Sequence, residues 1–281
     1  MSARTYTRAA RGFTLIEAIV VIVITGILSG IVALFIRVPI QNYADNAARA
    51  ELTDIADLAM QRLRRDIRLA LPNSIVLLNN GSSIQFLITK TGGRYLSADD
   101  GAVGNELDFT DATKLTFDVV GPMPDARQAI LPGDFIVVYN LGTGMSPADA
   151  YAGGNVATVT GVAGNTITMN ANPFAVVPPV PVMESPNHRF QVVTGTVTYI
   201  CNGVAPGAGT LTRVYSNTIS SANPPVGAPA LLANKVTACQ FDYQALPNTH
   251  SAMVGVSLTL ERPVSEGAVQ LVQQIHVDNT P

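Results

Sequence analysis

The sequence predicts an α+β protein in which a long N-terminal helix packs on an antiparallel β-sheet domain. Three observations support this prediction. Residues 13–36 are almost purely apolar, residues 48–70 repeat apolar side chains at spacings of three and four, and the segments after residue 74 alternate with the period of strands. A helix that feeds a series of antiparallel strands is typical of α+β folds, in which the apolar stripe of the helix covers one face of the sheet.

The apolar run Phe13–Ile36 contains 24 residues, enough to cross a bilayer as a helix. The leader before it, residues 1–12, carries three arginines and no acidic side chain. By the positive-inside rule the leader stays in the cytoplasm and everything after Ile36 lies on the far side. A secretory signal peptide has a shorter apolar core and a small-residue cleavage site, which we do not find here. An ordinary signal anchor is the remaining alternative.

One carboxylate, Glu17, interrupts the apolar run near its start. Burying a lone charge in lipid costs at least about 2.5–3.5 kcal/mol, so Glu17 needs a partner there. The segment is therefore expected to do more than anchor the chain.

The sequence Gly12-Phe13-Thr14-Leu15-Ile16-Glu17, after a short basic leader, resembles the type III signal of type IV pilins and type II secretion pseudopilins. The resemblance implies a type IV pilin-like fold, cleavage after Gly12 by a prepilin peptidase, and N-methylation of Phe13. Cleavage leaves a cationic amine on Phe13, with which Glu17 of a neighbouring subunit can pair in a filament. We expect this pairing to set the subunit register during assembly.

Residues 37–71 are predicted to continue the helix as an amphipathic segment. Its apolar stripe consists of Ala48, Leu52, Ile55, Ala59, Leu63, Ile67 and Ala70. Pro72 should end the helix, and Pro39 should kink or break it. Gly26 and Gly30 weaken the apolar part; they fit either close helix packing or local melting when the subunit leaves lipid for a filament.

Four arginines surround Asp66 near the end of the predicted helix: Arg62, Arg64, Arg65 and Arg68. A solvated helix face with local ion pairs, each worth a few tenths of a kcal/mol, is the favoured interpretation. A contact with an acidic neighbouring subunit is the first alternative, and phosphate contacts to DNA are the weakest one.

Residues 72–281 are predicted to form a β-rich domain. Within it, residues 91–186 form a Gly/Pro-rich insertion. The insertion begins with an Asp/Gly-rich stretch at 91–113 and ends with a Pro-rich stretch at 172–186. About four strands between these stretches could make a subdomain. The predicted strands are Ser74–Leu78, Ser83–Ile88, Lys114–Val120, Asp134–Asn140, Asn155–Thr160, Thr166–Asn170, Phe190–Val193, Thr196–Cys201, Thr210–Tyr215, Val236–Tyr243, Met253–Leu260 and Val269–Val277.

The exported part of the chain is mildly acidic. Without the three leader arginines, the chain has 14 basic and 20 acidic side chains, a balance of −6. This balance argues against a broad nucleic-acid-binding surface, which is usually basic. The low share of charged residues (13%), with 23 Gly and 18 Pro, suits an extracytoplasmic β-rich domain with many turns.

Cys201 and Cys239 are the two cysteines of the chain, and the predicted topology places both where disulfides persist. We predict a structural disulfide between them. A catalytic thiol would need a base close by, and a zinc site would need more ligands at suitable spacing.

The remaining polar motifs predict no enzyme activity, cofactor or metal. The acidic residues between 99 and 111 fit turns better than a calcium loop, because they lack the spacing of an EF-hand. Neither a phosphate-binding loop nor a nucleophile elbow occurs in the sequence.

Several later segments resemble narrower groups of the pilin superfamily. Residues 62–70, 231–236 and 241–243 resemble J-type pseudopilins and W-type minor pilins, and residues 189–201 and 273–279 resemble the O-type minor pilins of mannose-sensitive haemagglutinin (MSHA) pili. The resemblance implies an inner-membrane protein with a periplasmic C-terminal domain, later built into a pilus at the cell surface. Implied partners are other minor pilins, the major pilin and the inner-membrane assembly platform. Because the chain has Glu17, we expect its place in the pilus to be just below the tip.

Two other functions fit the same sequence. A type II secretion pseudopilin would share the fold. A tip adhesin or receptor would use residues 91–186 as its binding face, a region for which we find no resemblance. An enzyme is a distant third.

Overall fold

The computed structural model describes residues 12–176, 180, 182–246, 250–262 and 267–281. The leader residues 1–11 and part of the predicted Pro-rich stretch, Pro178, Pro179 and Pro181, lie outside the described residues. The chain divides into two compact units, Met1–Ala50 and Glu51–Pro281.

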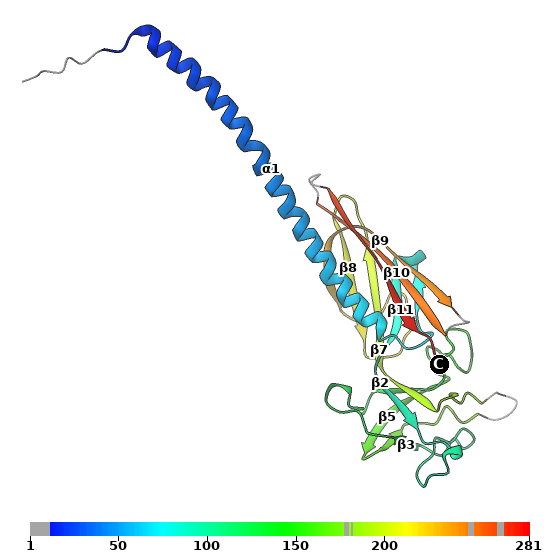
Figure 1. The fold of residues 1–281 in the computed structure, drawn as a ribbon. Coiled ribbons are helices and arrows are strands. Elements are labelled where there is room, and N and C mark those ends of the chain that lie inside the picture. Colours follow the sequence, from blue (N-terminus) through cyan, green and yellow to red (C-terminus); the bar gives the residue numbers. More distant parts are fainter. Residues whose placement is uncertain (1–11, 177–179, 181, 247–249, 263–266) are drawn as a thin grey trace, which may run out of the picture. The chain divides into compact units, whose positions relative to one another are not determined.

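One long helix, α1 (Leu15–Arg68), provides the α part of the fold (Figure 1). Its first part, Leu15–Ile36, has a mean hydropathy of 3.0 and is long and apolar enough to cross a membrane. Of the predicted kink or break at Pro39, the break does not occur, because the helix continues through this residue. A proline inside a helix removes one backbone hydrogen bond.

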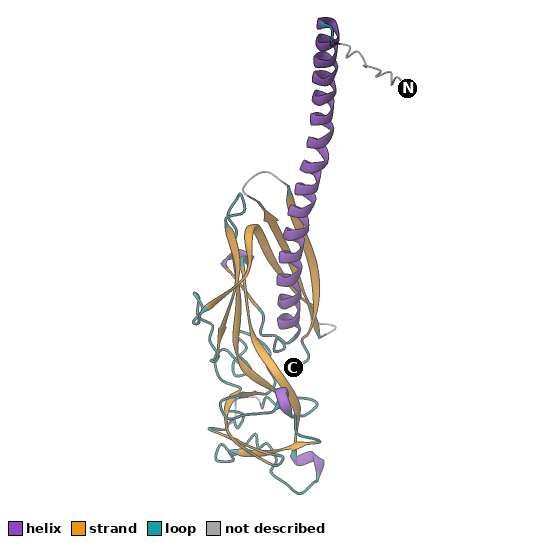
Figure 2. Cartoon of the chain, turned by 90° about the vertical axis from the view of Figure 1, so that its left-hand side faces the viewer, coloured by secondary structure: helices purple, strands orange, loops and turns teal. Residues whose placement is uncertain are grey.

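The described strands form one antiparallel sheet within Glu51–Pro281, which confirms the α+β class (Figure 2). The strand order is β1-β2-β3-β6-β5-β4-β7-β8-β9-β10-β11, and β2 also pairs with β7. The bounds are β1 Val76–Leu78, β2 Ser83–Tyr95, β3 Thr116–Val120, β4 Phe135–Val137, β5 Val156–Ala163, β6 Thr166–Met169, β7 Arg189–Asn202, β8 Gly209–Ser216, β9 Pro229–Leu246, β10 Ser251–Glu261 and β11 Ala268–Asp278.

A strand is present at every predicted position, and the largest differences from the predicted bounds are in β2, β7 and β9. β7 joins two predicted strands into one, and β2 and β9 extend beyond the predicted ends. β2 continues into the Asp/Gly-rich stretch because β7 pairs with it as far as Arg94. The pairing partner, rather than the local pattern, sets this length.

The helix ends at Arg68, three residues before the predicted Leu71. The Leu69 carbonyl accepts a hydrogen bond from the Thr89 N–H at 2.7 Å, and the Leu71 N–H donates to the Leu87 carbonyl at 2.8 Å. The chain after Arg68 therefore pairs with β2 instead of adding another helical turn.

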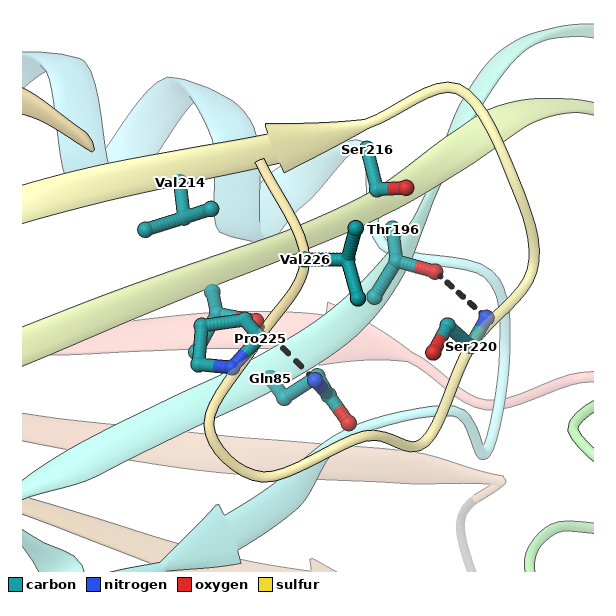
Figure 3. A pocket seen from close by; sticks show the side chains of 8 residues that line it. Gln85, Thr196, Val214, Ser216, Ser220, Pro225 and Val226 are labelled. Atoms are coloured by element: carbon teal, nitrogen blue, oxygen red, sulfur yellow. Dashed lines mark hydrogen bonds between the residues drawn. The ribbon is translucent and has the colours of Figure 1, made fainter. Parts of the chain in front are cut away.

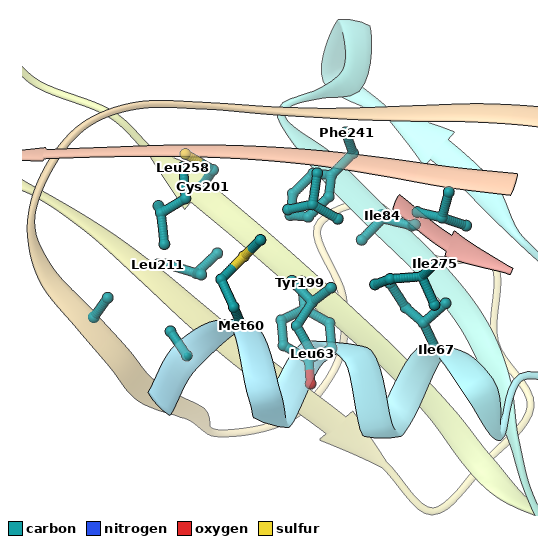
Figure 4. Packing of buried hydrophobic residues seen from close by; sticks show 14 of the residues in the cluster. Met60, Leu63, Ile67, Ile84, Tyr199, Cys201, Leu211, Phe241, Leu258 and Ile275 are labelled. Carbon is teal, nitrogen blue, oxygen red and sulfur yellow. The ribbon is translucent and has the colours of Figure 1, made fainter. Parts of the chain in front are cut away.

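The first core lies between the second half of α1 and one face of the sheet (Figure 4). Leu52, Leu63 and Ile67 are fully buried there, as the predicted stripe required. Replacing one of these leucines by alanine typically costs 2–5 kcal/mol. On the sheet side the core is formed by Ile84, Phe86, Val197, Tyr199, Leu211, Val236, Phe241, Val254, Leu258 and Ile275.

The insertion has a second core of its own. Phe117 of β3 and Phe190 of β7 meet edge to face, with ring centroids 5.3 Å apart, and Tyr95, Ile136 and Ile167 are buried with them. β2 and β7 contribute residues to both cores. The insertion is therefore built on the continuation of two strands of the main sheet.

Candidate functional site

The residues around the predicted cleavage point adopt a helix-capping arrangement. Gly12, Phe13 and Thr14 precede α1. The Thr14 carbonyl accepts hydrogen bonds from the N–H groups of Glu17 (3.1 Å) and Ala18 (3.2 Å), and the Thr14 hydroxyl accepts from the Glu17 N–H at 3.4 Å. An acidic side chain in the first turn interacts favourably with the helix dipole. Glu17 thus also supports the start of the helix, a role that the Thr-x-x-Glu spacing could have revealed.

The apolar segment presents its whole circumference to its surroundings. Every residue from Gly12 to Ile36 is exposed, including large side chains such as Leu15 and Phe35. Glu17 is the one charged residue between Leu15 and Ile36. The Thr25 hydroxyl donates to the Val21 carbonyl at 2.6 Å, so it is satisfied within the helix. A helix that is apolar all round requires lipid or other apolar helices around it.

The two glycines of the apolar segment have no packing role within the described chain. A Cβ atom added at Gly26 or Gly30 would meet nothing within 4 Å. Their spacing of four residues puts them on one face of the helix, where small residues permit close approach of another helix. This observation is compatible with the packing interpretation.

Asp66 does not lie on a solvated helix face, which corrects the favoured interpretation of the arginine-rich segment. Its side chain is buried and accepts hydrogen bonds from the Arg213 Nε at 2.6 Å and from the Tyr199 hydroxyl at 2.9 Å. The predicted local pair with Arg62 is present at 3.2 Å. Burial and the nearby carboxylate raise the pKa of the Tyr199 hydroxyl, so it stays protonated and donates. This network joins α1 to β7 and β8.

Sequence reasoning missed Arg213 and Tyr199 because both partners are more than 130 positions away from Asp66. A local signal was nevertheless available. Leu63, Asp66 and Ile67 share one helix face by their spacing of three and four, so Asp66 had to face the sheet with the apolar stripe.

The predicted disulfide is present. Cys201 of β7 and Cys239 of β9 are bonded, with their Cα atoms 6.2 Å apart and a sequence separation of 38. β8 pairs with β9 as far as Val236, so the disulfide joins β9 to β7 in the part of β9 that β8 no longer reaches. A loop of this length stabilises the fold by about 4 kcal/mol in the chain-entropy model.

The acidic residues of the insertion hold turns. The Asp108 carboxylate accepts the N–H groups of Thr110 (2.7 Å) and Asp111 (2.9 Å), and Asp100 accepts the Ser97 N–H at 2.9 Å. Hydrogen bonds from Thr110, first of all its N–H, lower the pKa of Asp108, and the Thr166 hydroxyl does the same for Asp118. Among the described residues, no group of three or more His, Cys, Asp or Glu side chains is arranged to hold a metal ion.

The small hollow beside β8 is already occupied by side chains (Figure 3). Gln85 Nε2 donates to the Thr198 hydroxyl at 3.0 Å, and the Thr196 hydroxyl accepts the Ser220 N–H at 3.0 Å. Its volume for a water-sized molecule is about 0 Å³. The Thr196–Ser220 bond and a bond from Gln85 Nε2 to the Ala222 carbonyl at 3.4 Å hold the β8–β9 connection on the sheet.

Comparison with known proteins finds a family match for one region of the chain. Residues 7–33 match the family described as "Prokaryotic N-terminal methylation motif". No curated protein and no solved structure matches the chain. The matched residues contain Gly12, Phe13 and Glu17 and overlap the exposed apolar helix. This motif implies processing by a prepilin peptidase and, with the apolar helix, suggests membrane anchoring. The chain carries a type IV pilin-like prepilin signal, which supports a type IV pilin-like or pseudopilin protein.

Proposed function

We propose that this protein is a minor pilin of a type IV pilus, with a type IV pilin-like fold and most similar to the O-type minor pilins of MSHA pili. Prepilin peptidase cleaves it after Gly12, and Phe13 is methylated. α1 holds it in the inner membrane with residues 72–281 in the periplasm. It is then built into the pilus, just below the tip, with other minor pilins and the major pilin, and it helps to initiate assembly.

One observation carries this proposal: Glu17 is the lone carboxylate in an exposed and otherwise apolar segment that begins directly after Gly12. A lone carboxylate is costly in lipid, and the new amine of Phe13 on a neighbouring subunit would supply the missing cation. In the same chain, Phe13 and Glu17 are also four residues apart, the spacing of a helical ion pair. Pairing between subunits and pairing within one subunit therefore have to be distinguished by experiment.

The direct test is mass spectrometry of the protein from sheared pili and from membranes, in cells with and without prepilin peptidase. We expect the mature chain to begin at N-methylated Phe13 and to occur in the pilus fraction. A Gly12→Val variant is a suitable control, because a Cβ atom added at Gly12 would meet nothing within 4 Å and the substitution should block processing without affecting the fold. A native chain that still begins at Met1 in cells with active peptidase would refute the proposal.

A type II secretion pseudopilin is the competing assignment, because the same motif supports it. Deleting the gene separates the two. Loss of pili with normal secretion supports the minor pilin, and loss of secretion with normal pili supports the pseudopilin.

A tip adhesin is a second candidate, and the structure of the insertion favours keeping it. Described residues of the insertion between Tyr95 and Phe174 form a core separate from the one under α1, and β2 and β7, which pair with each other, contribute to it. Such a subdomain can vary its loops without disturbing the main sheet. Shortening the loop around Val103, which is fully exposed, should reduce adhesion and leave piliation intact if the insertion is a binding face.

A further inference from the structure

The last turns of α1 carry a basic surface without an acidic partner in the described part of the chain. Arg64, Arg65 and Arg68 are exposed, and no ion pair joins them to a described residue. Asp66, the nearest carboxylate along the helix, is already paired with Arg62 and Arg213. The helix dipole favours cations in the last turn, but like charges one turn apart repel each other. An external anion would relieve this repulsion.

This basic surface lies beside an open sheet edge. β11 ends the sheet and pairs, among the described strands, with β10 alone, in continuous register from Ala268 to Asp278. The run 268–275 contains no charged residue, proline or glycine. Exposed edges are usually protected by such residues or by bulges, since their free N–H and C=O groups can pair with another chain. β11 is therefore able to accept a further strand.

Two surface hollows connect the arginines to this edge. The first, of about 580 Å³, is lined by Gln61, Arg64, Arg65, Arg68 and Leu69. The second, of about 330 Å³, is lined by Asp57, Met60, Gln61, Arg64, Leu271, Val272 and Gln273. Gln61 and Arg64 line both hollows, so the two hollows adjoin each other, and we call them together the α1–β11 groove. It is basic at one end and combines an apolar wall with free backbone groups along β11.

We infer that the α1–β11 groove receives an extended acidic segment of a neighbouring pilin-like subunit. The segment adds a strand to β11 and places carboxylates beside Arg64, Arg65 and Arg68. An added strand would pair with the open edge of β11. The arginines would select a strand that is flanked by acidic residues. This inference rests on the proposed function, because an assembly supplies the neighbour.

Other anionic partners fit less well. Lipid headgroups are bound by basic clusters next to a membrane span, whereas Arg64 lies 28 positions after Ile36. Nucleic acid would be repelled by an exported chain whose side-chain charge balance is −6. It also could not pair with the backbone groups of β11. Acidic surfaces do occur on chains of this kind: residues 91–186 carry ten acidic and three basic side chains.

The test places a photo-crosslinking amino acid at Gln61, which is exposed and lines both hollows, in the full-length chain in piliated cells. The control probe is at Val204, which is exposed on the connection between β7 and β8. We expect the Gln61 probe to crosslink an acidic peptide of a pilin-like subunit in sheared pili. Combining Arg64→Glu with Arg68→Glu should lower the yield about fivefold, the effect of losing two exposed ion pairs. Arg127→Glu, at an exposed arginine elsewhere, should not.

A pair of proline variants tests the strand addition separately. Adjacent N–H groups of a strand point to opposite neighbours, so one of Val272→Pro and Gln273→Pro removes an N–H that β10 uses and the other removes an outward N–H. The variant that keeps the wild-type melting temperature is expected to lose the Gln61 crosslink.

The outcomes separate the two proposals. If the mature chain is present in pili but the Gln61 probe gives no product beyond the Val204 control, or captures nucleic acid or lipid, the inference is wrong and the proposed function stands. An unchanged yield in the charge-reversal variant has the same meaning. If the chain is neither processed nor present in pili, both proposals fall.

Discussion

α1 carries a carboxylate near each end, and the two differ in their burial and in where their partners are. Asp66 lies under the helix and is satisfied by Arg62, Arg213 and Tyr199 of the same chain. Glu17 lies in a segment with no other charge, and its carboxylate has no ion-pair partner among the described residues. The first arrangement stabilises a fold. The second leaves a charge that only the cleaved N-terminus or another molecule can neutralise.

The surrounding surfaces differ in the same way. Between Glu51 and Arg68, the apolar face of α1 is covered by the sheet of its own chain. Between Leu15 and Ile36, no side chain is covered. The chain therefore folds its second half by itself and requires lipid or other subunits for its first half.

Removing Asp66 should have the largest effect on stability. Asp66→Ala removes the carboxylate that pairs with Arg213 beside the core. Breaking a buried pair in this way costs about 3–5 kcal/mol. Denaturant unfolding of the purified protein would measure the loss. Arg127→Ala, at an exposed arginine, is the matched control and should change the free energy of unfolding by less than about 0.5 kcal/mol. A similar small change for Asp66→Ala would show that the network does not stabilise the fold.

Removing the disulfide should have the next largest effect. Replacing Cys201 and Cys239 together by serine should lower the free energy of unfolding by up to about 4 kcal/mol. Reduction of the wild-type protein should produce a loss of the same size. If the double variant and the oxidised wild type unfold at the same denaturant concentration, the bond does not constrain this sheet.

Acidification should affect the insertion more gently. Hydrogen bonds lower the pKa of Asp108, Asp118 and Asp100 in the folded state. Groups with lowered pKa values contribute stability above the unfolded pKa, near 4, and that contribution is lost as the pH falls through the folded values. The melting temperature should therefore hold between about pH 7 and pH 5 and fall below about pH 4. Asp118→Asn should reduce this acid sensitivity, and an unchanged profile would count against the turn role.

Most of the fold could be predicted because its signals are local. The stripe through Leu52 and Leu63 identified the helix face that packs on the sheet, and alternation identified the strands. Longer-range features escaped. β2 continues to Tyr95 through Gly92 and Gly93 because β7 supplies the pairing partner, and nothing nearby in the sequence indicates that Asp66 meets Arg213.

The candidate site divides along the same line. Gly12, Phe13 and Glu17 lie within six consecutive residues, so a short motif was sufficient to find them. The α1–β11 groove brings together residues around positions 61 and 272, and sequence pattern alone suggested only its arginines.

The most direct test of the account compares Glu17→Ala with wild type for two quantities, membrane insertion and incorporation into pili. We predict unchanged insertion, because removing a charge from the apolar segment favours lipid, and strongly reduced incorporation. Ile16→Ala is the neighbouring control and should be incorporated normally. Normal incorporation of the Glu17→Ala protein would contradict the claim that this carboxylate finds its partner on an adjoining subunit.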